Sequence, residues 1–440
     1  MRAGIAIGGA MLALAVLSLI YVKNAARFAR QAMADGYLIV VGPDGHSDTI
    51  SRRKQRPTDI FKILVNFMQI TGSAAAINVG WTKFMMSIFT GWGTVSGGAD
   101  GNSFFSFECA FPSEENDLPR SVKTTVLLAF VPFVVWGAFV IVYTVHALRT
   151  KRSRQDWRLS SGIAFRAVLQ AAYISETKAF IRIFYCVRAG PLHGLFWAQD
   201  TSLTCYKGSH SLLVLFIGLP GFLLISIGFP AWLLYKLTRT DTLDQEQVIV
   251  RYGFLYKLYK SDTAAWEVVI LVRKAMFSAI VVFGRPLGGG TQSCLAMFIM
   301  VASILLQVRF QPFLESKLNN LELASLGIST FAFIVGNLAS QPEMGKWGTM
   351  VISIIFTCVA GTFIVYTAKQ IFDVLFSGLE EWVEKENPGS ELPISRAEVV
   401  TKAANSACRM SKTILNEKKK ACMEKISPHF FKTSNLESES

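Results

Sequence analysis

Long runs of apolar residues recur along the chain and are separated by shorter polar segments. Nine of these runs approach the roughly 20 residues that a helix needs to cross a bilayer. They lie at residues 5–22, 60–81, 124–148, 164–187, 212–237, 264–283, 291–308, 323–339 and 348–371. The pattern predicts an all-α fold, a polytopic transmembrane helical bundle of about nine spans followed by a C-terminal cytoplasmic helix.

The charges in the connecting loops predict the orientation of the chain. Lys and Arg gather in the loops before the second and fourth predicted spans, whereas the loop at 82–123 carries five acidic residues, from Asp100 to Asp117. Because cytoplasmic loops collect Lys and Arg, we expect the N-terminus outside and the C-terminus in the cytoplasm. An N-terminus outside indicates that an ectodomain precedes the first span in related proteins.

Three regions follow from this pattern. Residues 1–59 hold the first span and a basic cytoplasmic loop, residues 60–375 form the transmembrane bundle, and residues 376–440 form a cytoplasmic tail. The tail has a helical stretch at 395–426 with three consecutive lysines at 418–420, and its end is expected to be disordered. This helix is either simply solvated or contacts anionic lipid or a calmodulin-like partner.

Composition supports a membrane protein. The chain is 51% hydrophobic and only 17% charged, against about 25% charged residues in a typical soluble protein. Its net charge of +13, which is 44 minus 31, would suggest nucleic acid as the partner of a soluble protein. Here cytoplasmic loops account for the excess, so we expect no nucleic acid. The expected surroundings are the lipid bilayer of the plasma membrane or of an endomembrane.

The predicted span at 264–283 carries three charges, Glu267, Arg273 and Lys274. Each such group costs about 2.5–3.5 kcal/mol at the centre of a membrane helix. Glu267 and Lys274 share a helix face but lie two turns apart, too far to pair as i,i+4 neighbours do. Each charge therefore needs a partner on another helix, and we expect Glu176 of the fourth span to pair with the two basic residues.

Two other spans carry polar side chains along one face. In the second span, four polar residues fall within a sector of about 60°: Lys62, Asn66, Gln69 and Ser73. A similar face in the eighth span has Glu322, Ser325, Ser329 and Gly336. Such stripes either line an aqueous pathway or supply hydrogen bonds between helices, and Gly336 would allow close packing.

The fifth span contains two prolines, Pro220 and Pro230, each preceded by glycine at the second position before it. A proline removes a helical hydrogen bond, so we expect a kink or a break. Broken helices often line transport sites, although a simple packing kink is the commoner outcome.

The cysteines allow one disulfide on the outer side, where Cys109, Cys186 and Cys205 are predicted to lie. Cys186 with Cys205 closes the shorter loop, whereas Cys109 with Cys205 would join two loops. We favour the first pairing.

Motifs of common enzymes are absent from the sequence. It has no P-loop, no H-E-x-x-H and no G-x-S-x-G, and its five His residues show no metal-ligand spacing. We therefore expect neither an enzyme nor a cofactor or metal site. A voltage sensor is excluded as well, because that device needs Arg at every third position.

Four stretches together resemble the TRP-like multi-pass membrane proteins of fungi, algae and other protists, which are loosely related to TRP and polycystin channels. They are KILVNFMQI (62–70), the segment 183–210 followed by FIGLPGFLLISIGFP (216–230), YGFLYKLY (252–259) leading into WEVVILVRK (266–274), and RFQPFLESKLNNLELASL (309–326). The resemblance implies a cation-channel-like or sensory protein, with Trp266, Glu267, Arg273 and Lys274 in a shared motif. Tyr252, Tyr256 and Tyr259 would share one face of the helix before it, with a role in gating or in an interfacial aromatic belt.

The chain departs from TRP channels in one respect. Those channels have a pore loop between the last two spans, whereas SQPEMGKWG (340–348) is too short for a pore helix and filter. We expect a TRP-like channel or channel-related sensor that is permeable to cations and, by analogy with channels, forms a homo-oligomer. The alternatives are a non-conducting membrane receptor or anchor whose ectodomain is missing from this sequence, or a transporter of small solutes or lipids.

Overall fold

The computed structural model describes residues 57–96, 118–149, 154–188, 194–239 and 246–386. The predicted first span, Cys109 and the predicted tail helix lie outside these residues. The chain divides into two compact units: Lys62–Ile364 lies in the first, while the described parts of the second are residues 57–61 and 365–386. The predicted region boundaries at 59/60 and 375/376 stay predictions. The hydrogen bonds, ion pairs and cavity discussed below lie in the first unit.

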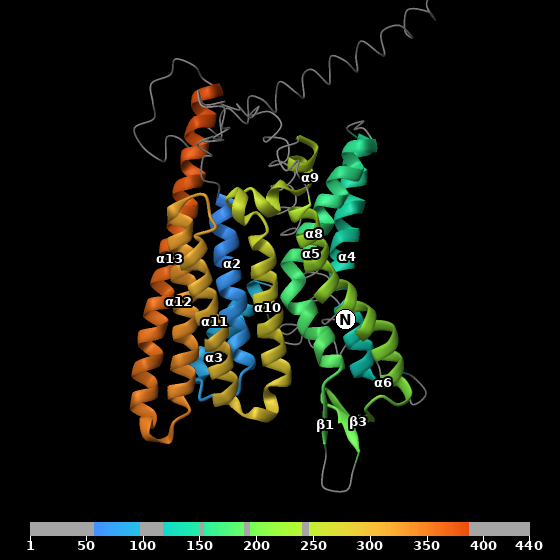
Figure 1. Cartoon of the computed structure of the whole chain (residues 1–440), viewed down its shortest axis with the longest axis vertical. Coiled ribbons are helices and arrows are strands. Elements are labelled where there is room, and N and C mark those ends of the chain that lie inside the picture. Colours follow the sequence, from blue (N-terminus) through green and yellow to red (C-terminus); the bar gives the residue numbers. More distant parts are fainter. Residues whose placement is uncertain (1–56, 97–117, 150–153, 189–193, 240–245, 387–440) are drawn as a thin grey trace, which may run out of the picture. The chain divides into compact units, whose positions relative to one another are not determined.

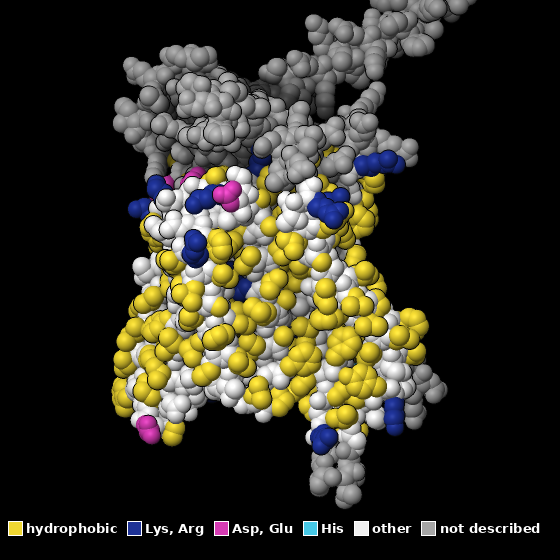
Figure 2. Space-filling view, viewed as in Figure 1, with side chains coloured by type: hydrophobic (Ala, Val, Ile, Leu, Met, Phe, Trp, Pro, Cys, Tyr) yellow, Lys and Arg dark blue, Asp and Glu magenta, His cyan; other side chains and the backbone are white. Residues whose placement is uncertain are grey.

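Five stretches of helix are long and apolar enough to cross a membrane, as a helical membrane protein requires. They are α4 (Arg120–Arg149), the continuous stretch from α6 to α8 (Gly208–Thr238), α11 (Gly289–Phe310), α12 (Ser316–Ala339) and α13 (Gly345–Glu386) with the turn before it. Apolar side chains cover much of the visible surface of the described helices (yellow in Figure 2), and Phe298 is 76% exposed. Large exposed apolar surfaces suit contact with lipid rather than water.

Three further predicted spans form helices that are less apolar or shorter: α2 (Pro57–Ser73), α5 (Arg154–Ile183) and α10 (Trp266–Phe283). Helix α2 has only 17 residues, and α10 carries three charged side chains. Charged residues occur at both ends and in the middle of α5. The total of nine spans and the orientation of the chain therefore stay predictions.

The segment after α2 differs from the sequence prediction. Helix α2 ends at Ser73, not near residue 81, and is followed by the 3-10 turn η1 (Ala74–Ala76). The residues expected to start an outer loop form α3 (Lys83–Val95), which begins where the Thr82 hydroxyl accepts a hydrogen bond from the Met85 amide at 3.2 Å. A Cβ added at Gly72 would lie 2.4 Å from the Gly93 nitrogen, so α2 and α3 are in backbone contact.

Pro220 and Pro230 lie within one uninterrupted helical stretch, so the predicted break is absent there. The stretch consists of α6 (Gly208–Leu213), η3 (Val214–Gly218), α7 (Leu219–Gly221), η4 (Phe222–Gly228) and α8 (Phe229–Thr238), with η3 and η4 in π-helical conformation. Because Pro230 has no N–H, the carbonyl of Ser226 lacks its usual helical donor. The Tyr173 hydroxyl of α5 donates to this carbonyl at 2.7 Å instead.

A small sheet interrupts the helical fold and was not predicted. Its antiparallel order is β1 (Cys186–Arg188), β2 (Leu195–Trp197) and β3 (Asp200–Thr204). The disulfide Cys186–Cys205 ties β1 to the residue after β3, which confirms the favoured pairing. The sheet is also anchored to the helices, because Trp197 donates a hydrogen bond to the Arg182 carbonyl at 3.1 Å.

Helix α10 packs against several other helices. The chain continues through α9 (Glu246–Tyr256) and the turn η5 (Ser261–Thr263) into α10, and through η6 (Arg285–Leu287) into α11. Helix α10 lies between α5 and α11, α4 packs along α5, and α11 packs along α12 (Figure 1). Between α12 and α13 there is only the short turn η7 (Pro342–Met344). This arrangement places most side chains of α10 in the interior, including all three charged ones.

The disulfide gives a first testable prediction. Replacing both Cys186 and Cys205 by Ala should lower the free energy of local opening of the sheet by about 3 kcal/mol, because the open state regains the freedom of a loop of this size. Amide hydrogen exchange in β1–β3 should accelerate on the order of 100-fold. Replacing the free, exposed Cys358 by Ala is the matched control and should leave the exchange unchanged. Equal exchange in the double variant and the wild type would contradict the prediction.

A second prediction concerns Asp200 on β3. Burial alone would raise the pKa of its carboxyl group, but hydrogen bonds from Ser121 and Ser202 lower the pKa below its usual value. A lowered pKa means that the ionised form stabilises the fold. The contribution is complete above the unfolded pKa of about 3.9 and disappears as the pH falls through the lower folded pKa.

Hydrogen-exchange protection of the Ser202 amide, which donates to Asp200, should therefore fall below about pH 3.9. In Asp200→Asn the Ser202 amide should be less protected at neutral pH than in the wild type. Its protection should not change as the pH falls from neutral to below about 3.9. A wild-type protection factor that stays constant down to pH 2 would show that the carboxylate does not stabilise this contact.

Candidate functional site

Helix α10 carries three buried charges in its otherwise apolar sequence. Glu267 is 1% exposed, Lys274 3% and Arg273 6%. Burying an ionised group without a partner costs several kcal/mol. The surrounding helices therefore have to supply the partners, and they determine what this centre can do.

Glu267 receives hydrogen bonds from three other parts of the chain. The Lys62 amine of α2 pairs with its Oε2 atom, and the Gln170 amide of α5 donates to Oε1. The Tyr259 hydroxyl, from the loop before α10, donates to Oε2 at 2.8 Å. One carboxylate thus joins α2, α5, α10 and this loop.

Arg273 forms a second ion pair, with Glu322 of α12. Its Nη2 atom lies 2.9 Å from Oε1 of Glu322, and both side chains are buried. The expectation that Glu176 would pair with Arg273 is therefore wrong. Glu176 is buried on α5, but its Oε2 atom has no hydrogen-bond partner among the described residues. Helix periodicity marked Glu322 as inward-facing but could not tell which basic residue it would meet.

Lys274 is the third charge of α10. Its amine interacts through charge mainly with Glu267. We use the name buried charge cluster for the five ionisable residues Lys62, Glu267, Arg273, Lys274 and Glu322. The cluster contains three basic groups and two carboxylates, so its basic groups outnumber its acids.

The polar stripe of α2 leads away from this cluster. Gln69 donates to the carbonyls of Ser96 and Ala171, at 2.8 and 3.1 Å, and so links α2 with the end of α3 and with α5. Ser73 accepts a hydrogen bond from the Lys178 amine at 3.2 Å. Asn66, between them and Lys62, is also buried. Gln69 and Ser73 therefore act as interhelical hydrogen-bonding groups, one of the two roles predicted for the stripe.

The stripe of α12 is mostly a packing face. The hydroxyls of Ser325 and Ser329 donate to the carbonyls of Glu322 and Ser325 in their own helix, each at 2.8 Å. A Cβ added at Gly336 would lie 2.3 Å from the ring of Trp81. The close packing expected at Gly336 is confirmed. Glu322 is the member of this stripe that reaches another helix through its charge.

Two of the family-like motifs meet beside the cluster. Tyr259 pairs with Phe313 in an isolated β-bridge, and the Lys260 amide donates to the Pro312 carbonyl at 2.8 Å. Asn319 fixes the second loop, because its side chain accepts from the Phe313 amide and donates to the Phe313 carbonyl. These contacts hold the Tyr259 hydroxyl against Glu267.

The three tyrosines do not share a helix face as predicted. Helix α9 ends at Tyr256, so Tyr259 belongs to the following loop, while Tyr252 lies under the guanidinium of Arg166 at 4.9 Å.

The role of Gln170 was not predicted from the sequence, because an isolated glutamine in a polar helix gives no periodic signal. The described residues contain no cluster of His, Cys, Asp or Glu that could hold a metal ion.

The ion pair between α10 and α12 gives the next prediction. Glu322→Gln should lower the stability of the purified protein by about 3–5 kcal/mol, because it leaves Arg273 buried without its counter-charge. Replacing both Arg273 and Glu322 by Leu should recover most of this loss. Unfolding in detergent, followed by circular dichroism, measures both effects.

The matched control is Glu343→Gln, which neutralises an exposed carboxylate and should change stability by less than about 0.5 kcal/mol. The single variants Arg273→Leu and Glu322→Leu complete the comparison. If the double variant lost as much stability as the two single variants together, Arg273 and Glu322 would not stabilise each other, and the assigned ion pair would be wrong.

Comparison with known protein families, with characterised proteins and with solved structures gives no match to this chain. The resemblance to TRP-like membrane proteins therefore stays a prediction from the quoted motifs. The function has to be inferred from the chemistry of the buried charge cluster and from the helices that carry it.

Proposed function

We propose that this protein is a channel-related integral membrane protein, permeable to cations, in which the buried charge cluster controls opening. Its five apolar helices indicate the membrane location. The single observation that carries the proposal is the coordination of Glu267 by Lys62, Gln170 and Tyr259. Ionisable residues inside a membrane bundle are costly and usually have a function.

The burial of the charges supports a membrane-spanning position for α2, α5 and α10. Glu267, Arg273 and Lys274 all face the interior, so α10 does not present these charges to lipid. Together with the predicted span at 5–22, the bundle then has nine spans, the N-terminus outside and the C-terminus in the cytoplasm. A chain of this kind belongs in the plasma membrane or an endomembrane.

The ion pairs make α10 the element on which a change of state depends. Lys62–Glu267 joins α10 to α2, and Arg273–Glu322 joins it to α12. A shift of α10 along either neighbour separates a buried pair, which favours two discrete arrangements over gradual movement. Lys274 interacts through charge mainly with Glu267 and also with Glu322, so a shift that moves either carboxylate changes the surroundings of its amine.

The conducting path we propose runs beside α2 and α10 instead of between α12 and α13. Only the turn η7 separates α12 from α13, which leaves no room for a pore helix. Beside α2, in contrast, lies α3, with 13 residues. This corresponds to about 20 Å, less than the roughly 30 Å of bilayer hydrocarbon, as in a re-entrant helix. A homo-oligomer would bring several such units together.

A second candidate function is transport of a small solute or lipid. The observation that favours it is the pair of π-helical segments, η3 and η4, around Pro220. Irregular helix turns are frequent at functional sites. A non-conducting receptor or anchor remains the third expectation from the sequence.

Flux measurements on purified protein in liposomes test the proposal. Vesicles containing the wild type should take up K⁺ or Tl⁺ faster than empty vesicles. Glu267→Gln and Lys62→Met should both change this rate, in the same direction and at least tenfold, because they remove the same ion pair. Glu343→Gln is the control and should behave as the wild type.

Each protein should first give a single symmetric peak in gel filtration, so that loss of folding is not mistaken for loss of flux. The proposal is wrong if vesicles with wild-type protein in both orientations show no cation flux and the two cluster variants do not differ from it. Uptake of an uncharged solute without cation flux would instead support the transporter.

A further inference from the structure

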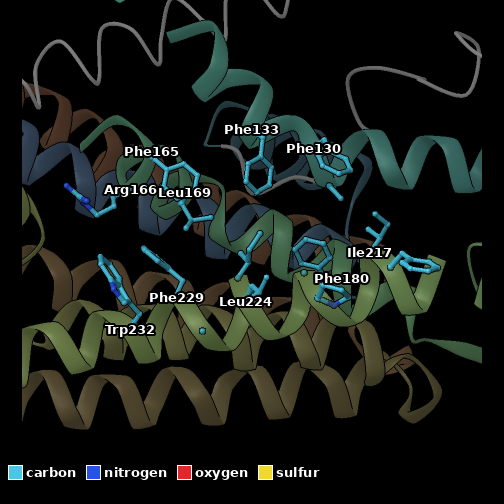
Figure 3. Close-up of a pocket in the computed structure, with 16 residues that line it drawn as sticks. Phe130, Phe133, Phe165, Arg166, Leu169, Phe180, Ile217, Leu224, Phe229 and Trp232 are labelled. Carbon is cyan, nitrogen blue, oxygen red and sulfur yellow. The ribbon is translucent and has the colours of Figure 1, made fainter. Parts of the chain in front are cut away.

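A cavity of about 500 Å³ lies between α4, α5 and the α6–α8 stretch. Its walls are apolar and rich in aromatic side chains, including Phe133, Phe165 and Phe229 (Figure 3). The volume falls within the range of about 300–1,000 Å³ that is usual for small-molecule sites. An interior of this character takes a hydrocarbon chain.

One charged residue lines the cavity, Arg166 of α5. Figure 3 shows Arg166 and Trp232 at one end of the cavity, with Phe180 and Ile217 at the other. The Arg166 guanidinium stacks over the ring of Tyr252 at 4.9 Å, which holds its orientation. A planar guanidinium at the end of an apolar cavity matches a phosphate or carboxylate on an apolar tail.

The rim of the cavity is open to the surface of the bundle. Leu224 and Phe216 line it and are 72% and 66% exposed. On a helix that spans a membrane, such side chains face acyl chains. The ligand can therefore enter sideways from the bilayer without passing through water.

The end of the cavity at Arg166 has the features of a membrane–water interface. Beyond Trp232, helix α8 continues with Tyr235 and Lys236, and Arg239 follows its last residue. This mixture of aromatic and basic residues is typical of the headgroup level. From Arg166 to Phe180 the cavity follows α5 for 14 residues, or about 21 Å. This exceeds the thickness of one leaflet, about half of the roughly 30 Å of hydrocarbon.

We propose that an anionic phospholipid of the bilayer occupies this cavity, with one acyl chain along α5 and the α6–α8 stretch and its phosphate at Arg166. The headgroup-level position of Arg166 favours a membrane phospholipid over a soluble anion. The site does not depend on the proposed channel function, because it lies on α4, α5 and α8, outside the buried charge cluster.

Native mass spectrometry in an uncharged detergent tests the proposal. Phosphatidylglycerol and phosphatidylcholine with identical acyl chains are offered in equal amounts. The wild type should retain phosphatidylglycerol at least tenfold more than phosphatidylcholine. Arg166→Gln should lose this preference, and Arg166→Lys should keep part of it, because the charge remains without the planar fork.

A second pair of variants tests whether the apolar cavity binds the acyl chain of the lipid. Ala129→Phe fills the cavity and should reduce retention of both lipids at least fivefold, whereas Leu305→Phe, at an exposed position of α11, should have no effect. If Ala129→Phe does not fold, Leu224→Trp narrows the rim at an exposed position and should have the same effect. Lys236→Gln controls for the loss of a positive charge elsewhere at the same interface.

The proposal is overturned if Arg166→Gln keeps the full preference for phosphatidylglycerol, or if both cavity variants that fold bind lipid as the wild type does. Retention of a free fatty acid but of neither phospholipid would also overturn it, because the occupant would then be a single-chain acid. Loss of cation flux in liposomes has no bearing on these results, so failure of the two proposals can be distinguished.

Discussion

The need to surround one buried carboxylate with donors governs how this bundle is assembled. Glu267 lies in an apolar interior, where an ionised group is tolerated only if its neighbours replace the hydration it has lost. Lys62, Gln170 and Tyr259 do this from three directions. Helices α2, α5 and α10, and the loop before α10, therefore have to meet at this point, whatever the rest of the packing allows.

Helix α5 connects the buried charge cluster with the apolar cavity. It contributes Gln170 to Glu267 and, one residue earlier, Leu169 to the apolar cavity. Adjacent residues of a helix point about 100° apart, so one helix can face a polar centre on one side and an apolar cavity on another. The low hydropathy of α5 thus has a structural explanation, because polar side chains such as Gln170 bind partners in the interior of the protein.

The sequence predicted those features that depend on one segment at a time. Apolar runs located α4, α11 and α12, helical spacing marked Glu322 as inward-facing, and loop length favoured Cys186 with Cys205. Features that depend on which segments are neighbours were out of reach. Arg273 meets Glu322 because the fold brings the two side chains together from α10 and α12, and no pattern in either helix reveals that. The strands β1 and β2 have only three residues each, which is too few for an alternating pattern. Helix α3 was expected to be part of a loop, because its two glycines are weak helix formers.

The long sequence separation of the ion pairs has a consequence for biosynthesis. Arg273 and Glu322 lie 49 residues apart, and Lys62 and Glu267 lie 205 apart. At about 5–20 residues per second, a ribosome makes Glu322 roughly 2–10 s after Arg273, and Glu267 roughly 10–40 s after Lys62. During that interval each basic side chain lacks the carboxylate that pairs with it in the folded protein. The nascent protein must keep them hydrated, at the translocon or at the membrane surface, until the later helices arrive.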